Sequence, residues 1–381
     1  MDSQRLLFCD TKTVLSYMEP NFRFNLALKI PSIRKASKAA PLHIDRLVFY
    51  DNSFILNETE YKMTVYRQCQ AKTKPPKSLF GANGEAHAQN RSFGEVTESS
   101  GEVDYDFDEY GFKIRPEESI QPGDIQLIES ASVRWRRGSK VDNLTYECPE
   151  KNSLPCNHFI RLYVSGSMSQ FPYTNMKMYY LMKRLLTIFF GNRNGEWTVK
   201  NMNLESSALL RWPANGYKPT VQCLNIGVCS QLKLNGVQSI IGSGVSLATL
   251  KTSSTVLCRI SDHPVLRNAE HLIVCCFPLP ASLSNLFSIQ VRKVSITFPF
   301  YSLSDEQLID MWMEKTRPTG VRYSILAGSK INLARISHPE VIQRSTDCIK
   351  LAMGDEAVVV VQYTEAHSKT WLTIETVPKR K

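Results

Sequence analysis

VRKVSITF, residues 291–298, is followed by LSDEQLIDMWMEK, residues 303–315, and the pair predicts a strand that leads into a helix. The first stretch has the β-branched content of a strand. In the second, Ser304 precedes Gln307 by three residues, which is the pattern of a capping box at a helix start. VRYSIL, residues 321–326, then returns as a strand. The segment therefore predicts a strand–helix–strand unit.

A second unit of this kind is indicated by HFIRLYVSG (158–166), YTNMKMYYLMKRLLTIFF (173–190) and EWTVKNMNLE (196–205). Apolar residues also recur at offsets zero, three and five, as in the strands of leucine-rich repeats. The five triplets are Ile44, Leu47 and Phe49; Phe159, Leu162 and Val164; Val221, Leu224 and Ile226; Ala269, Leu272 and Val274; and Val291, Val294 and Ile296. A chain that is 43% apolar matches this spacing often by chance, and the triplets are unevenly spaced. A degenerate, irregular repeat array is one interpretation.

The N-terminal residues 1–40 predict three short helices separated by Pro20 and Pro31, because proline is tolerated in a first helical turn but not inside a helix. Two apolar stripes at helical spacing are expected mainly in the core. They are Val14, Leu15 and Met18, and Phe22, Leu26 and Ile30. From residue 41 to 67 the period changes to two, which predicts a β-hairpin.

The remaining chain divides by composition. Residues 68–101 are rich in Gly, Pro, Ser and charge, which is typical of a flexible insertion. Residues 102–150 carry an acidic stretch and a connecting segment, and 151–381 form a strand–helix domain that closes with a hairpin. We expect an α+β or α/β fold, with a short helical segment, a hairpin and irregular repeat-like units.

The composition indicates a soluble protein. Of its 381 residues, 22% are charged, and no apolar run reaches the length of a membrane span. The N-terminus lacks the cleavage pattern of a secretory signal. Ten cysteines form no C-x-x-C pair, and several have apolar neighbours. Such thiols indicate a reducing compartment, so we expect a cytoplasmic or nuclear protein with no membrane partner.

The net charge of +10 raises the alternative of nucleic-acid binding. The densest basic run is VRWRRGSK, residues 133–140, and its candidate contacts are Arg134, Trp135, Arg136, Arg137 and Lys140. An aromatic among basic residues can stack a base while the cations bind phosphate. Arginines that alternate along an exposed strand give the same pattern, and we do not expect a nucleic-acid partner.

VDYDFDEYGF, residues 103–112, resembles a calcium loop only at first sight. The glycine required at the sixth loop position arrives two residues late, and the twelfth position is arginine rather than a bidentate glutamate. We expect an aromatic-anchored strand or turn in which Phe107 and Phe112 are buried while Asp106 and Glu109 face solvent. No metal is expected here.

Catalytic motifs are lacking. The sequence contains no G-x-S-x-G, P-loop, H-E-x-x-H or G-x-G-x-x-G pattern, and its seven histidines are scattered singly. No nucleophile, base and orienting group can be assembled from it. We therefore expect a protein that is not an enzyme and that uses no cofactor.

LFCDTKTVLSYMEPNFRFNLALKIPSIRKASKAAPLHIDRLVFYDNSFILN (7–57), DFDEYGF (106–112) and QPGDIQL (121–127) together resemble the nematode F-box C proteins. In that family a degenerate F-box-like segment precedes a domain of unknown function. The marker residues that carry the second likeness are Asp106, Phe107, Asp108, Glu109, Tyr110, Gly111 and Phe112. SLSDEQLIDMWMEKTRPTGVRYSI (302–325) extends the likeness towards the C-terminus.

The resemblance implies that the N-terminal helices dock on the Skp-type adaptor of a cullin ubiquitin ligase while the rest of the chain selects a protein substrate. The docking candidates it implies are Leu6, Leu7, Val14, Leu15 and Met18, with Phe22 and Leu26 behind them. The usual Leu-Pro start of the motif is replaced here by LLFCD. Helices that only pack on the following hairpin would show the same stripes.

Three hypotheses result. The first is a protein-interaction module that serves as the substrate-recognition subunit of such a ligase. The second is an interaction scaffold with no ligase link. The third, from another class, is a basic nucleic-acid-binding protein.

Overall fold

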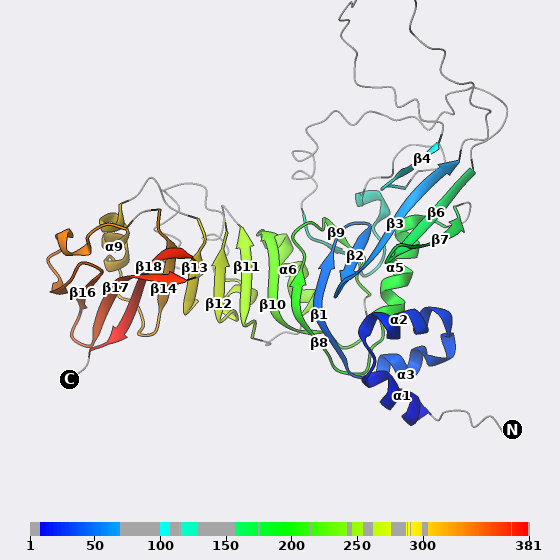
Figure 1. Cartoon of the computed structure of the whole chain (residues 1–381), viewed down its shortest axis with the longest axis horizontal. Helices are drawn as coiled ribbons and strands as arrows, with labels where there is room; N and C mark the ends of the chain where they lie inside the picture. The colour runs from blue at the N-terminus through cyan, green and yellow to red at the C-terminus, as the bar shows by residue number, and fades with distance from the viewer. Residues whose placement is uncertain are drawn as a thin grey trace, which may run out of the picture.

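The computed structural model describes residues 8–68, 100–106, 114, 116–128, 157–173, 176–213, 215–241, 246–253, 262–275, 287, 289, 291–298, 304–328, 330–366 and 368–379. Within these residues the protein is mixed α/β, and a mixed sheet of 16 strands runs from the N-terminal helices to the C-terminal strands (Figure 1). Across the described residues, no helix has the length and apolar content needed to span a membrane.

Three short helices and a 3-10 turn begin the described chain. They are α1 (Phe8–Ser16), α2 (Pro20–Lys29), η1 (Pro31–Ile33) and α3 (Arg34–Ala39). Pro20 and Pro31 each occupy a first turn, where the missing proline N–H removes no helical hydrogen bond. The predicted separation of the helices at these two prolines is confirmed.

An antiparallel block of six strands follows. Its strands are β1 (Leu42–Phe49), β2 (Ser53–Leu56), β3 (Thr59–Gln68), β4 (Ser100–Val103), β6 (Asn157–Val164) and β7 (Ser167–Pro172). The single hairpin predicted for residues 41–67 is wrong, because two tight turns divide this segment into three strands. The second turn uses Asn57 at a φ of 53°, a conformation that asparagine tolerates.

The strand, helix and strand predicted around residues 158–205 are all present, but they do not form one strand–helix–strand unit. β6 pairs antiparallel with β3 and β7, whereas β8 (Trp197–Asn203) pairs with β1 elsewhere in the sheet. Ser165 and Gly166 both have positive φ and form a two-residue turn that returns the chain at once into β7. The triplet Phe159, Leu162 and Val164 therefore lies in the antiparallel block.

A parallel block occupies the centre of the sheet. Continuing from β1 and β8, it contains β10 (Thr220–Val228), β11 (Thr249–Ser253), β12 (His271–Val274), β13 (Lys293–Ile296) and β14 (Arg322–Leu326). Each strand is parallel to its neighbour. The helices α6 (Gln231–Ile240), α7 (Pro264–Arg267) and α9 (Asp305–Met313) lie in the connections.

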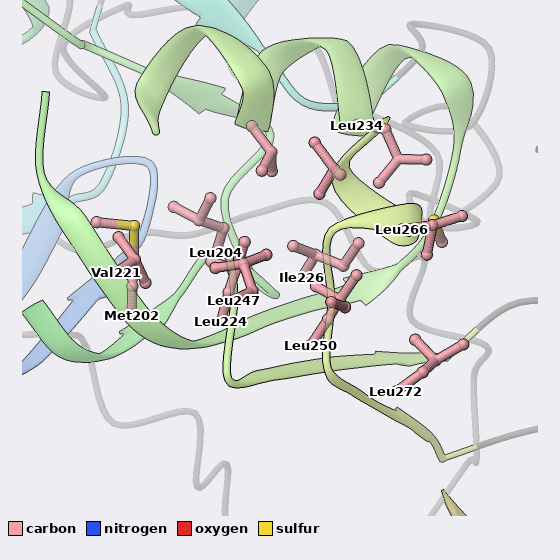
Figure 2. Close-up of a cluster of buried hydrophobic side chains, with 14 of the residues drawn as sticks. Met202, Leu204, Val221, Leu224, Ile226, Leu234, Leu247, Leu250, Leu266 and Leu272 are labelled. Atoms are coloured by element: carbon pink, nitrogen blue, oxygen red, sulfur yellow. The ribbon is translucent and has the colours of Figure 1, made fainter. Parts of the chain in front are cut away.

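One apolar row crosses all seven parallel strands in register. Its members, each at most 1% exposed, are Leu47, Met202, Leu224, Leu250, Leu272, Val294 and Tyr323. Figure 2 shows its centre, with Leu234 of α6 and Leu266 of α7 turned towards the strands. Trp312 of α9 packs edge-on against Tyr323, so α9 covers the same face.

Four of the five predicted triplets lie in this block. The structure adds two triplets that the sequence did not single out, one on β8 and one on β11. Val199, Met202 and Leu204 form the triplet of β8, and Leu247 and Leu250 belong to β11 and the residues just before it. The third position of the latter is Thr252, which is buried because its hydroxyl donates to the Gly227 carbonyl at 2.9 Å. A hydrogen-bonded threonine thus replaces the expected apolar side chain.

The C-terminal block is antiparallel and joins the sheet at β14. Its strands are β15 (Val341–Arg344), β16 (Cys348–Met353), β17 (Ala357–Ala366) and β18 (Lys369–Pro378), after the short helix η5 (Leu333–Arg335). The predicted closing hairpin is confirmed as β17 and β18. The capping box of Ser304 and Gln307 at the start of α9 is confirmed as well.

Replacing Leu250 in the apolar row by alanine is expected to lower the free energy of unfolding by about 3 kcal/mol, because truncating a buried leucine loses transfer free energy and leaves a cavity. Lys251→Ala, at the next residue on the exposed face, should change it by less than about 0.5 kcal/mol. Urea unfolding followed by circular dichroism compares the two variants. Equal losses would contradict the assigned register.

Candidate functional site

The structure divides the predicted adaptor-docking residues between a small core and the surface. Leu15 is buried, and Met18 packs against its cluster. Leu26 is half-buried on α2. Leu6 and Leu7 lie outside the described residues.

The surface part is an N-terminal apolar set that consists of Phe8, Val14, Tyr17, Phe22 and Ile30. Val14 and Phe22 were among the predicted docking residues, and their side chains are 47% and 57% exposed. Tyr17, which the sequence did not single out, is 88% exposed just after α1. The expectation that both apolar stripes belong to the core is wrong for Val14, Phe22 and Ile30.

The buried face of α2 is set by other residues. Phe24 stacks on Phe189 of α5 (Met178–Phe189), with ring centroids 4.3 Å apart and an interplanar angle of 7°. Ala27 and Arg23 are buried beside it. Because aromatic stacking fixes the rotation of α2 about its axis, Phe22 is turned outwards.

Two buried arginines bind the end of α3 to the sheet. Arg23 donates to Ser37 Oγ and to the carbonyl oxygens of Leu15, Ser37, Ala40 and Pro41. Arg193, which lies between α5 and β8, donates to the Ser37 and Ala40 carbonyls at 3.1 and 2.7 Å. Burial lowers the pKa of Arg23 to about 10, and burial together with Arg23 lowers the pKa of Arg193 to about 9. Both guanidinium groups remain charged at neutral pH.

Arg23 and Arg193 are expected to contribute unequally to the free energy of unfolding. Arg23→Met is expected to lower the free energy of unfolding by about 3 kcal/mol, because the Pro41 carbonyl loses its described donor and the Leu15 carbonyl keeps only the 3.4 Å bond from the Met18 N–H. Arg193→Met should lower it by less than about 1 kcal/mol, since its main acceptors keep Arg23 and its Nε has no described partner. Urea unfolding measures both, and a larger loss for Arg193→Met would contradict this assignment.

The first marker stretch begins with a structural carboxylate. Asp106 is only 5% exposed, so the expectation that it faces solvent is wrong. Its two oxygens accept from the backbone N–H groups of Met178 at 2.8 Å and Tyr179 at 3.0 Å. The N-cap residue of α5 is Lys177, whose side chain makes no capping bond. Asp106 therefore caps α5 from a distant part of the chain.

The second marker stretch, QPGDIQL, also holds α5. Asp124 accepts from Lys183 of α5 at 2.7 Å and from Arg211 at 2.6 Å, and its carboxylate is fully buried. The following residues Ile125–Gln126 form β5, which pairs with β9 (Leu209–Leu210). The short helix η2 (Pro116–Ser119) precedes it, and Arg211 donates to the Ser119 carbonyl at 2.6 Å.

Other predicted site residues lie outside the described part of the chain. From the marker stretch these are Phe107, Asp108, Glu109, Tyr110, Gly111 and Phe112. From the basic run they are Arg134, Trp135, Arg136, Arg137 and Lys140.

Replacing Asp106 tests its capping role. Asp106→Ala is expected to lower the free energy of unfolding by about 2 kcal/mol, because two first-turn N–H groups of α5 lose their acceptor. Asp106→Asn keeps one acceptor oxygen and should cost about half as much. Urea unfolding at pH 7 measures both.

The same residue predicts a pH dependence. Burial, only partly offset by the hydrogen bonds from Met178, Tyr179 and Tyr173, raises the pKa of Asp106. The folded state therefore holds this proton more tightly than the unfolded state, and the stability that Asp106 contributes falls as pH rises through the raised pKa. The advantage of wild type over Asp106→Asn should shrink between pH 4 and pH 7, and a growing advantage would contradict it.

A cavity of about 520 Å³ opens between the β1–β2 turn and the start of α5. Three of the charged residues in its lining are already bonded within the chain. Asp51 accepts from the backbone N–H groups of Ala208 and Leu209, Asp106 caps α5, and Arg211 pairs with Asp124. Within the described ranges no group of three or more His, Cys, Asp or Glu side chains could hold a metal ion. We therefore assign no reaction to the cavity.

Comparison with known proteins adds one finding. A family model described as a domain of unknown function, DUF3557, matches residues 177–326. This range begins one residue before α5 and ends with the last residue of β14, so it contains α5 and the parallel strands β8 and β10 to β14. It supports an uncharacterised domain in less than half of the chain, and it does not reach the F-box-like stretch at residues 7–57. No curated protein and no solved structure matches the chain.

Proposed function

We infer that the protein is an interaction module that acts as the substrate-recognition subunit of a cullin-type ubiquitin ligase. In this proposal the N-terminal helices dock a Skp-type adaptor and the sheet presents a surface to a protein substrate. The observation that carries it is the N-terminal apolar set, in which five large apolar side chains are exposed within residues 8–30. Large apolar side chains left exposed within one short segment favour a protein–protein interface.

The anchoring of these helices supports the proposal. Phe24 and the two buried arginines fix α2 and α3 against α5 and the sheet, while Leu15 fills a small core between α1 and α3. The exposed side chains are therefore presented on a rigid base, which lowers the entropic cost of binding. A scaffold with no ligase link would share this base but would not bind the adaptor.

The parallel block supports the repeat-array interpretation. From β8 onwards its triplets start at residues 199, 221, 247, 269 and 291, and intervals of this size fall in the range of leucine-rich repeats. With the members at 199 and 247 included, the uneven spacing seen in the sequence becomes nearly regular. Stacked repeats of this kind commonly offer an extended binding surface.

Adaptor binding is tested by co-purification of the full chain with a purified Skp-type adaptor. Val14→Asp combined with Phe22→Asp should reduce capture at least tenfold, because both changes place a charge in the apolar contact. The matched control is Val228→Asp combined with Phe298→Asp, which alters the same residue types at 52% and 41% exposure elsewhere. This control should bind as wild type does. If wild type fails to capture the adaptor, or if both double variants bind alike, adaptor docking through this set is wrong.

A further inference from the structure

The parallel block has a second face, opposite the helices. Because side chains alternate along a strand, the residues between the apolar rows point away from α6, α7 and α9. On β10 to β14 they form two rows in register. One row is Cys223, Thr249, His271, Lys293 and Arg322, and the other is Asn225, Lys251, Ile273, Ser295 and Ser324. None of these ten side chains is fully buried.

The charge on these two rows is of one sign. Lys251 and Lys293 are exposed and Arg322 is half-buried, and no acidic residue occupies either row. None of the three basic side chains forms an ion pair or hydrogen bond with another described residue. The Nε of Arg322 is buried without a partner within the described chain. Glu375 of β18 is the register neighbour of Arg322 and ends the basic surface on that side.

Histidine does not add to this charge at neutral pH. His271 shares a hydrogen bond of 2.8 Å with the Ser295 hydroxyl. Burial and the neighbouring Lys293 lower the pKa of His271 to about 4. The basic surface, defined by Lys251, Lys293 and Arg322, therefore carries three positive charges beside short polar side chains.

The spacing of these charges fits carboxylates on an extended peptide. Neighbouring strands lie about 4.8 Å apart, so Lys293 and Arg322 are adjacent. Lys251 is two strands away and in the other row, about 12 Å from Lys293. An extended chain places every second side chain about 7 Å apart on one side, within reach of these flexible groups. Arg322 is half-buried, and an arginine guanidinium forms strong charge-assisted hydrogen bonds with a carboxylate. The two rows contain no Phe, Tyr or Trp side chain on which a base could stack, which favours a peptide over a nucleic acid.

We propose that this face binds an acidic, extended segment of a protein partner through Lys251, Lys293 and Arg322. The proposal deepens the inferred function, because it rests on the chain being a recognition module and names the chemistry of what is recognised. It does not involve the N-terminal apolar set, so the two surfaces can be tested separately.

The test uses a fluorescein-labelled decapeptide of alternating Glu and Ser and measures fluorescence anisotropy with the full chain. Wild type should bind it with an affinity that falls as salt is raised. The triple variant Lys251→Gln, Lys293→Gln and Arg322→Gln should bind at least tenfold more weakly. The matched control is Lys315→Gln, Arg335→Gln and Lys379→Gln, which removes the same charges from other exposed positions and should bind as wild type does.

Two results would overturn the proposal. Equal loss in both triple variants would mean that net charge alone attracts the peptide. Tighter binding of a single-stranded DNA ten-mer than of the peptide, lost in the first triple variant only, would assign the surface to nucleic acid. Adaptor capture measured on the same variants separates the two ideas, since the first triple variant should still capture the adaptor if the inferred ligase role holds.

Discussion

The apolar row that runs in register from Leu47 in β1 to Tyr323 in β14 is the constraint on which the rest of the structure depends. A slip of one residue in any of these strands would turn its whole apolar set to the opposite face. The row therefore fixes which side of the sheet the helices cover. For the same reason it fixes which polar side chains lie on the face of the sheet opposite the helices. The matched uncharacterised domain contains β8 and β10 to β14 of this block but not β1.

Helix α5 depends on contacts that come from far along the chain. Its N-terminus is capped by Asp106 and its middle is held by Asp124 through Lys183, and the two carboxylates come from separate stretches that precede it. Both carboxylates are buried; Lys183 and Arg211 pair with Asp124, whereas the hydrogen bonds to Asp106 only partly offset the cost of removing its charge from water. The acidic stretch that resembled a calcium loop thus contributes at least one residue to the scaffold.

Local patterns predicted what local forces decide. The prolines at residues 20 and 31, the capping box of α9 and the closing hairpin all rest on contacts between residues close in sequence, and the structure bears them out. Sequence patterns did not predict contacts between residues that are far apart in the chain. No sequence pattern near Asp106 indicates that this residue caps a helix more than seventy residues away. Nothing around Phe22 shows that Phe24 would turn α2 by stacking on α5. The repeat on β11 was obscured because Thr252 satisfies its burial through a hydrogen bond rather than through an apolar side chain.

The connection between the N-terminal helices and the parallel strands contains no flexible linker. α3 ends at Ala39 and β1 starts at Leu42, while Arg193 ties the end of α3 to the chain that enters β8. The α3–β1 connection and the Arg193 contact therefore lead into β1 and β8, which are paired neighbours in one sheet. Only β8 and β10 lie between β1 and β11, so the basic surface begins about 15 Å from the strand that carries the helices. A linker of flexible residues would let that separation vary. Here the number of strands sets it, so an adaptor on the helices and an acidic segment on the sheet would be held in one fixed relation.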